Sequence, residues 1–122
     1  MKRRALVLFA HGGRDPGWAA PFERLRQITQ AQLPDVAVTL AYLDLMQPAL
    51  AETVSRLSQA GTEEVTVVPV FLAQGGHLLR DLPSIVAKLQ TDNPGLILRV
   101  AGAVGEDAEV LRAIAQYCVR SL

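Results

Sequence analysis

Residues 5–18 read ALVLFAHGGRDPGW, and this stretch decides the fold. Its first six residues form a continuous apolar run, which is typical of a strand that is covered on both faces of a parallel sheet. The run ends at His11 and the pair Gly12–Gly13, where the chain must leave the sheet. Turns after strands usually contain glycine or small polar residues. An imidazole at a strand exit is therefore unusual. The stretch therefore predicts a buried first strand and a loop that carries a candidate functional histidine.

Strand-like and helix-like segments alternate along the rest of the chain. Runs of β-branched and apolar residues predict further strands at 36–43, 64–72 and 96–101. Apolar residues at helical spacing predict helices around 18–33, 50–57, 82–89 and 110–118. Pro69 cannot donate to a strand ladder, so we expect it at the exit of the third strand or at a bulge.

This alternation predicts an α/β fold with short right-handed crossovers and one domain over residues 1–122. The expected sheet is open, parallel and four-stranded, in the order 2-1-3-4, with helices on both faces. That order creates a switch point between strands 1 and 3, where ligands bind in open α/β sheets. The chain has two histidines, and they follow these two strands as His11 and His77. Both are therefore expected beside one crevice.

Composition excludes several classes of protein. Twelve basic and twelve acidic residues cancel, which argues against nucleic-acid binding. No segment approaches the ~18 apolar residues of a membrane span. The basic start MKRR precedes too short an apolar run for a secretory signal, so we expect a cytoplasmic protein whose first strand begins there. The single cysteine, Cys118, lies on the apolar stripe of the last helix and is expected to pack in the core.

The two histidines suggest metal binding, because neutral imidazole is the commonest ligand for transition metals. Two imidazoles are an incomplete set for a zinc-like ion, so the site would be open, transient or completed by another chain. The alternative is that each ring merely bonds a loop carbonyl. No serine stands on a G-x-S-x-G elbow, which excludes lipase-like acyl transfer. A phosphate-binding turn at the glycines after His11 stays open, although no phosphate-loop motif is present.

Three charged residues fall near the same predicted edge of the sheet. Arg14 and Arg80 each follow a histidine by three residues and suit carboxylates or phosphates, although each also fits a solvated surface charge. Asp44 lies at the exit of the second strand. Its carboxylate has two interpretations: it orients a ligand or accepts protons, or it caps the next helix together with Gln47, which the spacing favours.

Four segments together resemble the small sirohydrochlorin chelatases of the class II chelatase family. They are HGGRDP, LAYLDLMQPAL, VVPVFLAQGGHLLRDLP and GEDAEVL, which span nearly the whole chain. The resemblance implies a chelatase-like half-domain that inserts Co²⁺, Fe²⁺ or Ni²⁺ into sirohydrochlorin without ATP or an organic cofactor. It also implies a homodimer with a shared active-site cavity. A non-catalytic carrier of the metal or the tetrapyrrole is the alternative.

The resemblance assigns roles to individual residues. His11 and His77 match the metal-binding histidines of the family, and Asp44 stands where the family commonly has glutamate. Gly13 stands where serine is common, so a hydroxyl contact is lost there. The catalytic candidates are His11, His77 and Asp44, and the substrate-binding candidates are Gly12, Gly13, Arg14, Gly75, Gly76 and Arg80.

Overall fold

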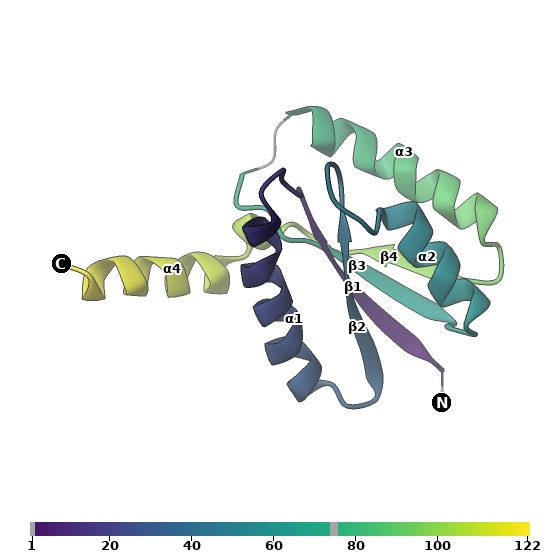
Figure 1. The fold of residues 1–122 in the computed structure, drawn as a ribbon, viewed down its shortest axis with the longest axis horizontal. Helices are drawn as coiled ribbons and strands as arrows, with labels where there is room; N and C mark the ends of the chain where they lie inside the picture. Colours follow the sequence, from purple (N-terminus) through teal and green to yellow (C-terminus); the bar gives the residue numbers. More distant parts are fainter. Residues whose placement is uncertain (1, 74–75) are drawn as a thin grey trace.

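A computed structural model describes the backbone of residues 2–73 and 76–122, and the side chains of residues 2–73 and 81–122 (Figure 1). The strands are β1 (Arg4–Ala10), β2 (Val36–Tyr42), β3 (Glu64–Pro69) and β4 (Ile97–Val100). The helices are α1 (Ala20–Gln32), α2 (Leu50–Gln59), α3 (Gly76–Asp92) and α4 (Ala108–Arg120), with short 3₁₀ turns η1 (Pro16–Ala19) and η2 (Val104–Glu106).

The sheet confirms the predicted topology. All three strand pairs are parallel, and the order is β2-β1-β3-β4. Pro69 ends β3, as expected of a residue without an amide hydrogen, so the strand stops three residues before the predicted end at Leu72. The apolar runs predicted the strands well because a strand that is buried on both faces needs apolar residues throughout.

Two apolar layers lie on opposite faces of this sheet. On one face, Val7 and Phe9 pack with Val54 of α2 and with residues of α3. On the other face, Leu8 and neighbouring β2 residues pack against Phe22 of α1. Figure 1 shows this arrangement, with α2 and α3 on one side of the sheet and α1 on the other.

The two outer strands are held by the same glutamine contact. Gln30 of α1 accepts a hydrogen bond from Val38 N (3.0 Å), and Gln90 of α3 accepts one from Leu98 N (3.1 Å). Each side-chain amide also donates to the carbonyl two residues earlier, Val36 O for Gln30 and Leu96 O, just before β4, for Gln90. Each glutamine thereby pairs with edge groups that no further strand covers. The two edges differ in burial, because β2 is mostly buried and β4 mostly exposed.

Helix α3 begins earlier than the sequence predicts. Its apolar spacing marks 82–89, but the helix runs from Gly76 to Asp92 and passes through Pro83. The glycine pair and the proline favour a loop locally. Packing of Leu82, Ile85 and Leu89 against the sheet overrides that preference, and the helix extends beyond the packed segment toward β3.

The expectation that Cys118 packs in the core is wrong. Helix α4 forms as predicted, but Cys118 is exposed, and none of the helix's residues, all of which are described, is buried. Figure 1 shows α4 projecting away from the sheet, with the C-terminus far from the other elements. The amphipathic pattern predicted the helix correctly, but it could not specify what covers the apolar stripe. Among the described helices, none is long and apolar enough to cross a membrane.

Candidate functional site

The loops after β1 and β2 are bonded to each other at the carboxyl edge of the sheet. Leu43 N donates to Ala10 O (2.8 Å), and Asp44 N donates to His11 O (3.0 Å). Gly12 has a φ of +85°, and a Cβ there would lie 1.9 Å from the Asp44 carbonyl oxygen. Only glycine allows this turn and this approach without strain. The paired loops therefore fix the backbone on which His11 stands.

The His11 ring lies on an aromatic platform. Its centroid is 4.1 Å from that of Phe71, with the planes tilted by 44°. Phe71 is only 2% exposed and meets Phe9 edge to face at 5.7 Å. His11 itself is exposed, and no hydrogen bond to its ring occurs among the described residues. The structure thus presents an imidazole whose position is set by packing and whose nitrogens are not used by described neighbours.

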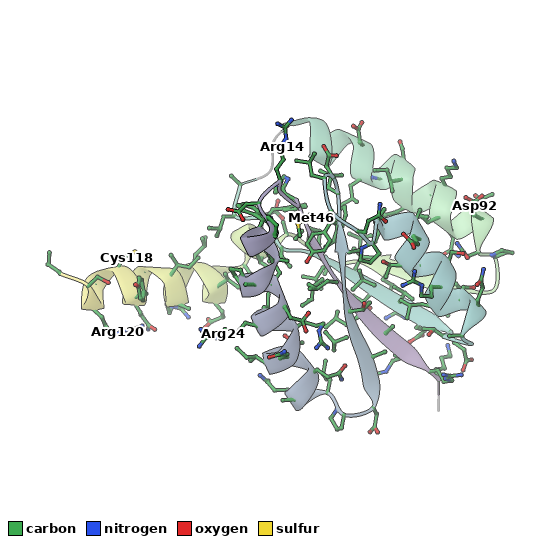
Figure 2. The ribbon with its side chains drawn as sticks, viewed as in Figure 1. Arg14, Arg24, Met46, Asp92, Cys118 and Arg120 are labelled. Carbon is green, nitrogen blue, oxygen red and sulfur yellow. The ribbon has the colours of Figure 1, made fainter. Side chains whose placement is uncertain are left out.

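The next residues connect this loop to α1. A Cβ on Gly13 would lie 2.9 Å from the Trp18 ring, so this position also requires a small residue. Asp15 accepts a hydrogen bond from Gly17 N (2.9 Å) and caps η1. Arg14 between them is exposed, and no ion pair to it occurs among the described residues. Figure 2 shows Arg14 projecting outward at this end of the molecule.

Asp44 does not cap the next helix. The N-cap of α2 is Ala49, without a side-chain hydrogen bond, so the capping interpretation is wrong. The Asp44 side chain is exposed, and its Oδ1 accepts a hydrogen bond from Leu45 N (2.8 Å). The chain turns away before the helix starts, with Leu45 at a φ of +66°, which is uncommon for a residue other than glycine. Positive φ at such residues occurs preferentially at functional sites.

His77 and Arg80 lie in the first turns of α3, which follows β3 at the carboxyl edge. Their side chains lie outside the described residues, as does the whole of Gly75, whereas Gly76 begins the helix. Because β1 and β3 are adjacent and parallel, the backbone positions of both histidines fall at the same edge of the sheet. The roles assigned to these residues stay predictions. Among the side chains that are described, no group of three or more His, Cys, Asp or Glu forms a metal site.

Two features of this region were not anticipated from the sequence. The first is Phe71, whose signal is an aromatic residue just beyond a strand that ends at proline. The second is Tyr42 at the end of β2, whose Cβ lies 3.5 Å from the Cβ position at Gly12. Burial raises the pKa of Tyr42 above its ordinary value of 10.0, and the charge of Glu23 adds to the shift. The neutral phenol is thus part of the packing under the loop.

Comparison with known proteins shows the family of this chain. A model of the CbiX family matches residues 5–120. Sirohydrochlorin cobaltochelatases of Methanococcus maripaludis and Methanopyrus kandleri are 34% and 32% identical over 75% and 67% of this chain. The matched segments span 63% and 57% of those relatives, so they correspond to about three fifths of each.

Solved structures show the same fold. A CbiX protein from Marinobacter aquaeolei VT8, described as a cobalamin (vitamin B12) biosynthesis protein, is 32% identical, with a TM-score of 0.85 over 97% of this chain and 96% of its own. The sirohydrochlorin chelatase SirB of Bacillus subtilis subspecies spizizenii, solved with cobalt, has a TM-score of 0.79 at 20% identity. That match covers 93% of this chain and 49% of SirB. With the family model matching nearly the whole sequence, the chain belongs to the CbiX family.

Proposed function

We propose that this chain inserts a divalent metal ion, cobalt in the first place, into sirohydrochlorin. The observation that carries the proposal is the exposed His11 imidazole, held on Phe71 at the carboxyl end of β1. The histidine stands at the switch point of a CbiX-family sheet, where open α/β folds bind ligands. Cobaltochelatase relatives favour cobalt as the metal, and iron and nickel are the alternatives.

The metal ion is a substrate, so the protein must hold it and then release it. Neutral imidazole binds all three candidate metals, and a set of two histidines, His11 and His77, leaves most coordination positions to water. Pyrrole nitrogens can replace that water without displacing a complete protein ligand set. A closed four-ligand site would instead retain the ion, as structural zinc sites do.

Insertion must also remove two protons. Two pyrrole N–H bonds break as metal–nitrogen bonds form, and the two protons leave for nearby bases. Asp44 is one candidate acceptor because its carboxylate is exposed, and among the described residues its one hydrogen bond is accepted by Oδ1 from Leu45 N. A histidine that is not bound to metal is the other. The backbone bond from Asp44 N to His11 O (3.0 Å) holds the loops of both candidates together.

The substrate carries several carboxylates, which need positive partners. Arg14 is exposed beside the loop, and Arg80 lies in the early turns of α3, so both can offer guanidinium donors. Gly12 and Gly13 carry no side chains, so a flat macrocycle can approach the backbone closely. Gly75 and Gly76 before His77 can serve in the same way.

One chain offers only one wall to a flat macrocycle. Binding sites for small molecules usually enclose most of the ligand surface. A two-fold homodimer with the two carboxyl edges facing one cavity would supply the second wall and a second pair of histidines. We therefore propose that the active form is a homodimer.

The test is an absorbance assay with sirohydrochlorin and Co²⁺, Fe²⁺ or Ni²⁺, without ATP. We expect the spectrum of the metallated product to appear faster than in a matched solution without protein, with many products formed per protein chain. Binding of sirohydrochlorin or metal at a rate of insertion equal to the protein-free control would instead identify a carrier. Faster insertion only after ATP addition would contradict the ATP-independent reaction.

A further inference from the structure

A ring contact orients the His11 imidazole where a hydrogen bond usually orients a metal ligand. Metal-binding histidines commonly donate their second ring N–H to a carboxylate or a carbonyl, which fixes the ring and makes it a stronger ligand. Among the described residues, no hydrogen bond to the His11 ring occurs. The ring instead contacts Phe71, with 4.1 Å between the centroids and 44° between the planes.

Phe71 is itself held from several directions. Its side chain is 2% exposed, and its ring meets Phe9 of β1 edge to face. Its carbonyl oxygen accepts a hydrogen bond from Gly105 N (3.0 Å), and Val70 N donates to Phe9 O (2.8 Å). A Cβ on Gly105 would lie 2.0 Å from the Leu72 carbonyl oxygen, so η2 packs directly against this segment. The ring of Phe71 is therefore a fixed surface for any group that rests on it.

The side chain of His11 has more freedom than its backbone. The hydrogen bond from Asp44 N to His11 O (3.0 Å) and the turn at Gly12 fix the main chain. An exposed side chain on a fixed backbone still has several staggered rotamers. Contact with a buried aromatic ring favours the rotamers in which the two rings touch. Since the nitrogen lone pairs lie in the plane of the imidazole, such a contact can orient the ring without using its nitrogens.

We propose that Phe71 is a positioning residue for metal binding by His11, an inference that rests on the proposed chelatase function. The Phe71 ring selects the imidazole orientation that meets the metal ion. It supplies no negative charge and no hydrogen-bond acceptor to the second nitrogen, so it does not make the imidazole a stronger ligand. Orientation without strengthening suits an ion that the protein must release to the tetrapyrrole.

Steady-state kinetics of cobalt insertion by Phe71→Leu separate positioning from a structural role. The variant keeps an apolar side chain but loses the ring. We expect the KM for Co²⁺ to rise about ten-fold, at the low end of the range for groups that orient metal ligands, because the imidazole then spends less time in the binding orientation. The kcat at saturating Co²⁺ should stay close to the unmodified value. A merely structural loss would reduce the folded fraction, which lowers kcat and leaves KM unchanged.

The matched control removes apolar volume from the same core without touching a ring. Val54 of α2 is fully buried in the cluster that also contains Phe71. Val54→Ala should therefore lower stability and leave the KM for Co²⁺ unchanged. An unchanged KM in Phe71→Leu would overturn the proposal, and so would an equal rise in KM in Val54→Ala. If Phe71→Leu does not fold by circular dichroism, Phe71→Met takes its place with the same expectation, because the flexible methionine fills the space without an aromatic ring.

Nuclear magnetic resonance of the histidine rings tests the same contact without sirohydrochlorin. The chain has two histidines, so comparison with His77→Ala assigns the signals of His11. We expect the Phe71 ring current to displace the His11 ring protons from their positions in urea, and Phe71→Leu to remove that displacement. Paramagnetic broadening of these signals should require about ten-fold more Co²⁺ in Phe71→Leu than in the unmodified chain. Equal Co²⁺ titrations, or undisplaced His11 signals in the unmodified chain, would overturn the proposal. Failure of the unmodified chain to insert cobalt would refute the proposed function instead, and this titration would still test Phe71.

Discussion

Two regions of the molecule expose opposite kinds of surface. One is the carboxyl end of β1 and β2, and the other is the region of β4 and α4. At the first, loop backbones are bonded together through Asp44 and His11, and an exposed imidazole stands on a buried ring. At the second, strand and helix expose apolar side chains such as Ile97 and Ile114. A fixed backbone with an unused polar group is suited to a small ligand or ion. Loosely covered apolar surface is suited to another protein chain.

The largest effect on stability is expected where the two loops meet. Gly12→Ala would place a Cβ 1.9 Å from the Asp44 carbonyl oxygen, at a φ of +85°. We expect a loss of about 2 kcal/mol or more in the free energy of unfolding. Gly95→Ala is the matched control, because no atom lies within 4 Å of its added Cβ. Urea titration of both variants measures the difference, and equal stabilities would show that the paired loops are not held as described.

The fold was predictable from the sequence to a greater extent than the site. Alternating apolar segments and short crossovers define the strand order, because few arrangements of four parallel strands satisfy both. The same order brings the positions of His11 and His77 to one edge. The stacking of His11 on Phe71 was not predictable, because it depends on how two loops far apart in sequence pack together.

Two predictions from local sequence patterns were wrong: that the apolar face of α4 packs in the core, and that Asp44 caps the next helix. The spacing of Val110 to Cys118 predicts an apolar face, but a pattern within one chain cannot tell whether the same chain buries it. The spacing of Asp44 and Gln47 matched a cap, yet the chain runs on to Ala49 before the helix starts. Local signals of this kind compete with loop geometry, which only the three-dimensional structure reveals.

Removing each glutamine in turn compares the stability contributed at the buried edge strand β2 with that at the more exposed edge strand β4. Gln30→Ala leaves the buried edge of β2 at Val38 unpaired, and Gln90→Ala does the same at Leu98 on the more exposed β4. Because an unpaired group costs more where water cannot reach it, we expect losses of about 2 kcal/mol and about 1 kcal/mol respectively. Chemical denaturation of each variant gives the two values. A larger loss for Gln90→Ala would mean that the β4 edge is the better covered of the two.

The smallest expected effect is on the pH dependence of the unfolding free energy, compared between variants of the two tyrosines. Burial first, and the charge of Glu23 second, raise the pKa of Tyr42. The folded state then favours the protonated phenol, so this contribution is present below the ordinary pKa of 10.0 and is lost as pH rises through the raised pKa. Tyr42→Phe should therefore reduce the fall in unfolding free energy between about pH 9 and pH 11. Tyr117→Phe on α4, where the side chain is 65% exposed, is the control variant, and a fall in Tyr42→Phe equal to that in Tyr117→Phe would contradict the burial of Tyr42.

The proposed function requires that the His11 imidazole at the carboxyl edge carries the metal chemistry. The most direct measurement is the initial rate of cobalt insertion into sirohydrochlorin by His11→Ala, with thermal unfolding of the same sample. We predict a loss of at least about 100-fold in rate, because a metal ligand is removed. The accompanying loss of the ring stack on Phe71 should cost only about 1 kcal/mol in stability. Gln59→Ala, exposed at the far end of α2, should keep the full rate. A folded His11→Ala variant that inserts cobalt at the unmodified rate would contradict the proposed role of His11.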